Sequence, residues 1–162
     1  MKIESIIFDF DGVIIESLDI KGWAFGKLFE RYPEYVDEIS AFHYANGGMS
    51  RFDKFRYIYE HIINEDLSES KFDRLCIEFS ELVYQLVIGC KYVEGAKDFL
   101  SKYYDRIPLF IVSGTPHNEM HAITKARGIF KYFKGIESEL LCDFESTFPL
   151  SAECKPNHVH FL

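Results

Sequence analysis

The chain has 162 residues, nearly half of them apolar, and a net charge of −8 at pH 7. This length suits one domain or a compact core with a small insert, and the apolar content excludes a disordered chain. The negative charge argues against a general binder of nucleic acid or acidic membranes, because such proteins need basic patches to meet phosphates. A small phosphorylated substrate stays open, since a few positive groups in a cleft can hold it.

The chain begins with a short β-branched and aromatic run, residues 3–10. Such a run predicts a buried strand of a parallel sheet, which is apolar on both faces. Asp9, Asp11 and Gly12 interrupt the run at its end. A strand that ends in acids and a glycine suggests a site at its carboxyl end, where open α/β sheets bind their ligands.

The segment over residues 17–89 has a helical pattern. Apolar side chains recur at three- and four-residue spacing over residues 72–86, and a similar stripe joins Phe52, Phe55, Tyr59 and Ile62. An earlier helix is expected over residues 17–32. We interpret the whole segment as an inserted helical mini-domain.

The alternation of strands and helices resumes after residue 89. The pattern predicts a helix after residue 95, a buried strand over 107–112, a helix from Pro116 to about 127, a third strand near 136–142, a loop over 144–153 and a short helix after Pro156. Proline suits the first helical position because its missing amide hydrogen would be unpaired there anyway. The expected fold class is therefore α/β.

The two acids after the first strand can share one phosphate. One carboxylate of Asp9 and Asp11 can attack it and form an acyl phosphate, while the other protonates the leaving oxygen and later activates water. Like charges this close favour a divalent cation. Gly12 permits the tight backbone needed beside a bound phosphate. The competing interpretation is a plain acidic turn.

A second polar group follows the strand over residues 107–112. The hydroxyl of Ser113 can bond a phosphoryl oxygen, and the amides of Gly114 and Thr115 lie at the start of the next helix. Ser-Gly-Thr-Pro is also a plain strand-to-helix turn. Lys155, near the end of the chain, could neutralise phosphate, although a lone lysine is commonly a solvated surface charge.

Residues 6–13, IIFDFDGV, resemble the first motif of the haloacid dehalogenase superfamily, with its phosphoglycolate-phosphatase-like and β-phosphoglucomutase-like branches. The resemblance implies a Rossmann-like parallel-sheet core, residues 1–16 and 90–162, with an inserted helical cap over residues 17–89. It also implies Mg²⁺ as the cofactor.

The resemblance also assigns expected roles to single residues. Asp9 would be the nucleophile and Asp11 the acid and base, and both would serve the metal. Ser113 is similar to the hydroxyl of the second motif, with Gly114 supplying an amide. Lys155 is similar to the lysine of the third motif.

The fourth motif of the superfamily, a later acidic loop that supplies carboxylates for Mg²⁺, has no counterpart in the sequence. The core is therefore expected to be C-terminally truncated, or to belong to a degenerate relative. An open sheet edge would then invite self-association or a partner chain.

The sequence therefore predicts a Mg²⁺-dependent phosphohydrolase that acts on a small phosphorylated metabolite through an aspartyl-phosphate. A sugar-phosphate mutase of the same fold and a catalytically inactive remnant or binding module are the alternatives. A dehalogenase is less favoured, because Asp11 is the residue expected of phosphoryl-transfer members. We interpret Arg51, Lys54 and Arg56 as a solvated face rather than as substrate ligands.

The remaining features indicate a cytoplasmic protein. The four cysteines form no CxxC pair and show no metal-ligand spacing with a histidine, so we expect reduced thiols. The first apolar run is too short for a signal peptide, and no stretch approaches the length of a membrane span. His117 and His121 lie four residues apart on an expected helix, and we interpret them as a solvated face rather than a metal site.

Overall fold

The computed structural model describes residues 3–139. Its strands are β1 (Ile6–Phe8), β2 (Leu109–Pro116) and β3 (Gly135–Glu139). Its helices are α1 (Leu18–Leu28), α2 (Val36–Ala45), α3 (Arg51–Tyr57), a π-helix (Ile58–Ile63), α4 (Glu69–Gly89), α5 (Ala96–Tyr103), α6 (His117–Ala126) and a short 3₁₀ turn (Phe130–Tyr132).

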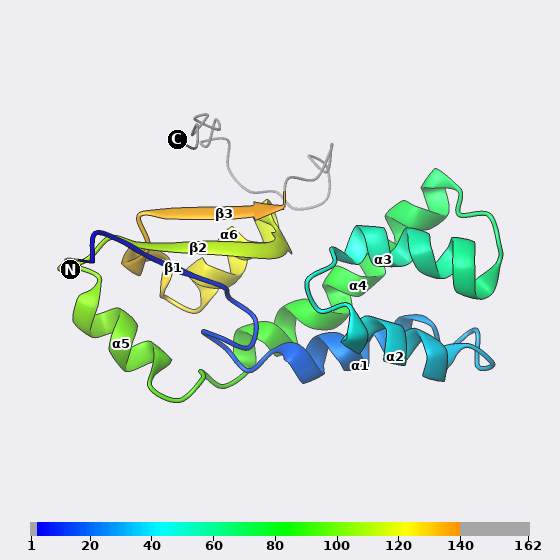
Figure 1. The fold of residues 1–162 in the computed structure, drawn as a ribbon, viewed down its shortest axis with the longest axis horizontal. Coiled ribbons are helices and arrows are strands. Elements are labelled where there is room, and N and C mark those ends of the chain that lie inside the picture. Colours follow the sequence, from blue (N-terminus) through cyan, green and yellow to red (C-terminus); the bar gives the residue numbers. More distant parts are fainter. Residues whose placement is uncertain (1–2, 140–162) are drawn as a thin grey trace.

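The described strands form one parallel sheet in the order β1-β2-β3 (Figure 1). Ile6 aligns with Leu109, and Ile111 aligns with Ile136. This arrangement confirms the predicted α/β class with a parallel sheet. Helix α6 packs against β2 and β3, and the ring of Phe99 on α5 meets that of Phe8 at 5.8 Å.

The other face of the sheet carries exposed apolar side chains. Ile7 is 61% exposed and Val112 is 48% exposed, whereas Leu109 and Ile111 on the helix-covered face are fully buried. Among the described strands, β1 pairs only with β2 and forms an edge of the sheet. The predicted open edge is therefore present within residues 3–139.

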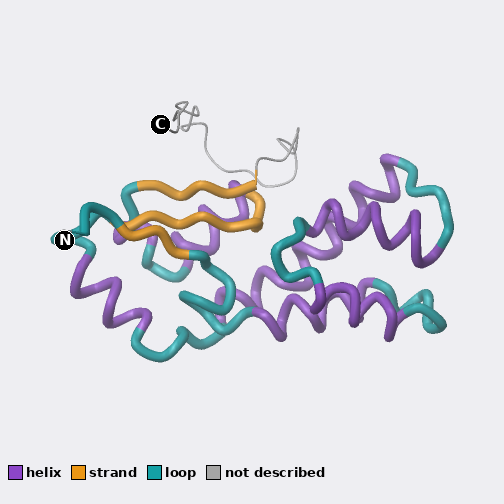
Figure 2. Tube along the Cα trace, in the orientation of Figure 1, coloured by secondary structure: helices purple, strands orange, loops and turns teal. Residues whose placement is uncertain are grey.

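The helical part lies beside the carboxyl ends of the strands, as Figures 1 and 2 show. Helices α1 to α4 and the π-helix bury an aromatic core in which Phe25, Phe29, Phe55 and Phe79 contact one another. All four residues of the stripe from Phe52 to Ile62 are buried, as their spacing predicts. The division into core and cap at residues 16/17 and 89/90 stays a prediction.

Several predicted boundaries were wrong. The first strand is shorter than residues 3–10, because the chain turns after Phe8: the amide of Ile14 donates to the carbonyl of Phe10 at 2.9 Å. The first helix ends at Leu28 rather than near residue 32.

The second strand is longer than predicted and runs through the Ser-Gly-Thr turn to Pro116. Pro116 has extended backbone angles, φ −53° and ψ 144°, so it precedes α6 instead of starting it. Gly128, with φ +70°, follows the last residues of α6 as expected. The third predicted strand corresponds to β3, whereas the loop over residues 144–153 and the helix after Pro156 lie outside the described residues.

None of the described helices combines the length and the apolar character needed to cross a bilayer. Cys76 and Cys90 are free thiols, and Cys142 and Cys154 lie outside the described residues. Burial raises the pKa of Cys76 to about 11, which makes this thiol a weak nucleophile.

Two half-buried histidines make stability depend on pH. Burial, followed by the charges of Lys54 and Lys21, lowers the pKa of His43 to about 4. Burial, followed by the neighbours His117 and Lys125, lowers the pKa of His121 to about 4. The unfolded chain binds these protons near pH 6.5, so the folded state loses stability as the pH falls from about 6.5 to 4.

We expect each histidine to contribute on the order of 1–2 kcal/mol to this loss, after allowance for solvent screening. Urea unfolding at pH 7 and pH 5 would measure it in the wild type and in His43→Gln/His121→Gln. The carboxylates titrate in both proteins, so their contribution to the change in the free energy of unfolding cancels in the comparison. An equal loss of stability in the double variant would contradict the prediction.

Candidate active site

A cleft of about 400 Å³ lies where the strand ends meet the helical part. The predicted residues Asp9, Asp11, Ser113, Gly114 and Thr115 all line it. Two segments about a hundred residues apart in sequence thus meet, because β1 and β2 are parallel neighbours and their carboxyl ends share one edge of the sheet.

Asp9 is the first residue after β1, and its side chain is exposed at the cleft. Its Oδ1 accepts a hydrogen bond of 2.6 Å from the amide of Phe10. This bond orients the carboxylate locally. Among the described residues no cation forms an ion pair with Asp9.

Asp11 is held far more tightly than Asp9. Its Oδ1 accepts from the Ser17 hydroxyl at 2.6 Å, and its Oδ2 accepts from Lys21 Nζ at 2.5 Å and from the Thr115 hydroxyl at 3.3 Å. Lys21 also donates to Thr115 Oγ1 at 3.0 Å. The carboxylate therefore has a set orientation between α1 and the end of β2.

Lys21 was missed by the sequence reasoning. A signal existed, because Ser17 and Lys21 lie four residues apart at the start of a helix and so share one face. The spacing alone does not show that this face meets Asp11. That contact depends on the turn over residues 9–17, which brings the start of α1 back to Asp11.

A tight turn connects the two acids to α1. Gly12 has φ +72°, in the left-handed region that favours glycine, and its amide donates to the carbonyl of Ile15 at 2.8 Å. Leu18 Cδ1 would lie 2.7 Å from a Cβ at this position. Gly12 thus allows the chain to reverse beside the cleft.

The polar residues at the end of β2 are held by their own backbone, unlike Asp11, which is held by side chains of other segments. Ser113 is buried, and its Oγ accepts from the amide of Thr115 at 3.2 Å. A Cβ on Gly114 would meet no described atom within 4 Å, so the backbone is open at this position. Lys155, the remaining predicted residue, lies outside the described residues.

The prediction of a solvated face for Arg51 and Lys54 was wrong. The Arg51 side chain is 10% exposed and pairs with Glu119 on α6 at 3.0 Å. Lys54 is only 3% exposed. Arg56, with a side chain 57% exposed, alone of the three faces solvent. Helix α3 packs on more than one side, so its polar positions Arg51 and Lys54 meet protein rather than water.

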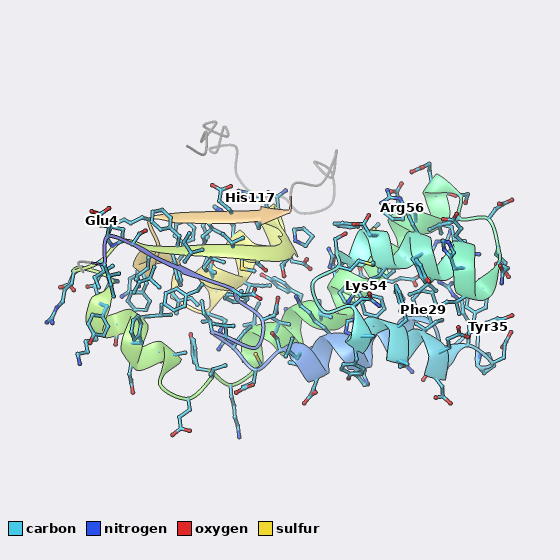
Figure 3. The ribbon with its side chains drawn as sticks, viewed as in Figure 1. Glu4, Phe29, Tyr35, Lys54, Arg56 and His117 are labelled. Carbon is cyan, nitrogen blue, oxygen red and sulfur yellow. The ribbon has the colours of Figure 1, made fainter. Side chains whose placement is uncertain are left out.

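The ammonium of Lys54 lies in the helical part, between α3 and α2 (Figure 3). It donates to the carbonyl of His43 at 3.1 Å, and the His43 Nδ1 is 3.3 Å away. Burial, and after it the charge of Lys21, lowers the pKa of Lys54 to about 8. The same two lysines line the cleft.

The two acids suit a hard divalent cation in part. Within residues 3–139 no three His, Cys, Asp or Glu side chains gather as a metal cluster. Mg²⁺ nevertheless keeps several waters and is commonly bound through one or two carboxylates and substrate phosphates. The exposed carboxylate of Asp9 at the cleft is a donor of this kind.

Two other features of the described residues lack the paired acids that line the cleft. A hollow of about 640 Å³ at the π-helix and the start of α4 is lined by none of the predicted catalytic, substrate-binding or metal-binding residues. His117 and His121 contact each other with ring centroids 4.2 Å apart, and His117 Nδ1 lies 3.1 Å from Ser138 Oγ. Both histidines are half-buried, whereas the sequence predicted a solvated face.

Comparison with protein families gives one match. The family model described as haloacid dehalogenase-like hydrolase matches residues 6–143. This range includes both polar groups at the strand ends and the whole helical part. No curated protein matches the chain at a significant level.

Solved structures share the fold. CbbY from Rhodobacter sphaeroides, in complex with phosphate, has a TM-score of 0.64 at 18% identity, over 85% of this chain and 64% of its own. YfnB from Bacillus subtilis, assigned as a HAD-hydrolase and bound to magnesium, has a TM-score of 0.61 at 17% identity, over 85% and 66%. A protein from Thermotoga maritima assigned as a beta-phosphoglucomutase has a TM-score of 0.57 at 21% identity, over 84% and 61%. The chain thus spans less than two thirds of each of these structures.

Proposed function

Because the chain belongs to the haloacid dehalogenase-like hydrolase family, we propose that it is a Mg²⁺-dependent phosphohydrolase. Its substrate is a small phosphorylated metabolite, and it acts in the cytoplasm. One observation carries the proposal: Asp9 is exposed at a cleft where the carboxylate of Asp11 is held by Ser17, Lys21 and Thr115. Two acids with such different surroundings can take different roles.

In this proposal Asp9 is the nucleophile. Its Oδ2, which accepts no hydrogen bond from the described residues, attacks phosphorus in line with the leaving oxygen and forms an aspartyl-phosphate. In the first step Asp11 must carry a proton, which it gives to the leaving oxygen, and the carboxylate so formed then accepts a proton from the water that hydrolyses the intermediate. The three donors on Asp11 fix the orientation of its side chain in the cleft that Asp9 also lines, and a fixed orientation favours proton transfer.

The phosphoryl oxygens need neutral and positive partners. The backbone at Gly114, the Thr115 hydroxyl and the ammonium of Lys21 lie at the strand ends and supply them. Lys155 is proposed to add a further charge. Mg²⁺, held by the Asp9 carboxylate and the Asp11 backbone carbonyl, would screen the phosphate from the attacking carboxylate.

The test is Mg²⁺-dependent hydrolysis of 4-nitrophenyl phosphate by purified residues 1–162, beside Asp9→Asn. We expect release of phosphate that needs the metal and falls to background in the variant, because an amide is no nucleophile here. Glu4→Gln, an exposed acid outside the cleft, is the matched control and should keep full activity.

Two outcomes would favour the alternatives. A well-folded chain that binds phosphate without hydrolysing any ester would favour a binding module. A sugar phosphate that is isomerised without net release of phosphate would favour a mutase. Hydrolysis that persists in Asp9→Asn would remove the nucleophile from the proposal.

A further inference from the structure

Helix α4, which runs from the helical part back toward the sheet, ends without a strong cap of its own (Figure 1). It has no basic residue in its last turn. Cys90, the next residue, is extended with φ −69° and ψ 162°, so no left-handed residue closes the helix. The Cys90 thiol, a weak donor, reaches the carbonyl of Val87 at 3.2 Å. The last carbonyl groups of a helix have no partners inside it, so this end needs donors from elsewhere.

Arg127, which directly follows α6, supplies these donors. Its Nη1 donates to the carbonyls of Val87 and Ile88 at 2.8 and 2.5 Å, and its Nη2 donates to the carbonyl of Cys90 at 2.9 Å. The guanidinium also lies over the ring of Tyr92, 4.3 Å from the centroid. A positive charge at this position offsets the negative end of the helix dipole. One side chain from the end of α6 therefore caps α4.

No other described group uses the charge of Arg127. Within residues 3–139 it forms no ion pair, and its Nε is buried without a hydrogen bond. It lines neither the cleft nor the hollow at the π-helix. A charge removed from water is costly unless it is hydrogen-bonded, and the end of α4 provides those hydrogen bonds.

The contact lies where the helical part joins the α/β part, which comprises the three strands with α5 and α6. The amide of Glu16 donates to the carbonyl of Lys91 at 3.0 Å, and the amide of Val93 donates to the carbonyl of Ile14 at 3.1 Å. The segment that enters the helical part thus runs antiparallel beside the segment that leaves it. Two strands this short are marginally stable alone, so the joint needs a further contact to hold the helical part at one angle.

The polar contacts across the cleft depend on that angle. Lys21 on α1 donates to Asp11 and to Thr115, and Arg51 on α3 pairs with Glu119 on α6. Each of these contacts joins a side chain of the helical part to one of the α/β part. A rotation of one part relative to the other would separate them.

We propose that Arg127 is a positioning residue. By capping α4 from the end of α6, it fixes the angle between the helical part and the sheet, and through that angle it keeps Lys21 and Arg51 on their partners. The inference concerns the arrangement of the two parts and needs no assumption about the proposed reaction.

Two measurements on the full chain test the proposal. Double electron–electron resonance gives the distance distribution between nitroxide labels at Glu38 on α2 and Asp98 on α5, both of which are exposed. The labels are attached to keto-bearing amino acids, so the four cysteines stay unmodified. Amide hydrogen exchange at Glu16 and Val93 reports how often the joint opens.

We expect one narrow distance distribution in the wild type and a broader, shifted one in Arg127→Met. The two amides should exchange roughly 10- to 100-fold faster in this variant, as for the loss of a hydrogen bond from a charged donor. Arg127→Lys keeps the charge but reaches fewer carbonyls, so it should lie between the two. Lys125→Met, which removes an exposed charge at the end of α6, is the matched control and should behave as the wild type.

A merely structural role for Arg127 predicts a different result. Arg127→Met would then lower the melting temperature without changing the distance distribution, as is expected of Ile111→Val, which weakens the packing of a buried residue of β2. This second control separates a loss of stability from a loss of position.

A wild-type distance distribution in folded Arg127→Met, with unchanged exchange at the joint, would overturn the proposal. If Arg127→Met does not fold, the result for Arg127→Lys decides: a broader distribution than that of the wild type supports the proposal, and an unchanged one overturns it.

Discussion

Asp11→Asn is expected to reduce the hydrolysis of an alkyl phosphate by roughly 10²- to 10⁴-fold, the usual contribution of a positioned general acid. The reduction should be much smaller for 4-nitrophenyl phosphate, because nitrophenolate leaves without a proton. The position of Asp11 supports the assignment: it lines the same cleft as Asp9, and three donors at 2.6, 2.5 and 3.3 Å fix its orientation. Steady-state rates with both substrates, in the wild type and the variant, measure the difference.

Glu16→Gln is the control for this experiment. Glu16 is exposed and lies in the same turn, so it tests whether loss of a nearby negative charge is enough. It should leave both rates within about twofold, since a solvated charge has little influence at a distance. Equal losses for the two substrates in Asp11→Asn would mean that Asp11 serves the fold or the metal instead of the leaving oxygen.

Glu119→Gln is expected to destabilise the protein by about 3–5 kcal/mol, because it leaves a buried guanidinium without its counter-charge. Arg51 and Glu119 are 10% and 11% exposed and join α3 to α6 across the cleft. The guanidinium also donates to the Ser80 hydroxyl at 3.1 Å, but within the described residues no acid other than Glu119 pairs with it, so the variant leaves its charge unbalanced. Urea unfolding of the wild type and the variant gives the difference.

The double variant Arg51→Met/Glu119→Met should recover most of this loss, because it removes both charges and keeps the apolar contacts with Phe52 and Phe79. Glu30→Gln is the matched control. Glu30 pairs with Lys27 at 2.6 Å, but both side chains are largely exposed, so its loss should cost less than about 1 kcal/mol. A double variant no more stable than Glu119→Gln would contradict the account of an uncompensated charge.

The amino-acid sequence by itself determined the features that depend on local pattern. The apolar run before Asp9 and Asp11 predicts a parallel strand with a site at its end, and β1 ends there. The stripe from Phe52 to Ile62 predicts a buried helical face, because apolar side chains at three- and four-residue spacing must be covered. The meeting of Asp11 with Thr115 follows from parallel strands, whose carboxyl ends share one edge.

Only the tertiary structure decided how the charged residues of the helical part are used. Lys21 meets Thr115, and Arg51 meets Glu119, across separations of 94 and 68 residues. The periodicity of a helix shows which positions share a face, but it does not show whether that face meets water or a second layer of protein. Lys54 is buried because its face of α3 meets other protein segments, although the sequence predicted a solvated face there.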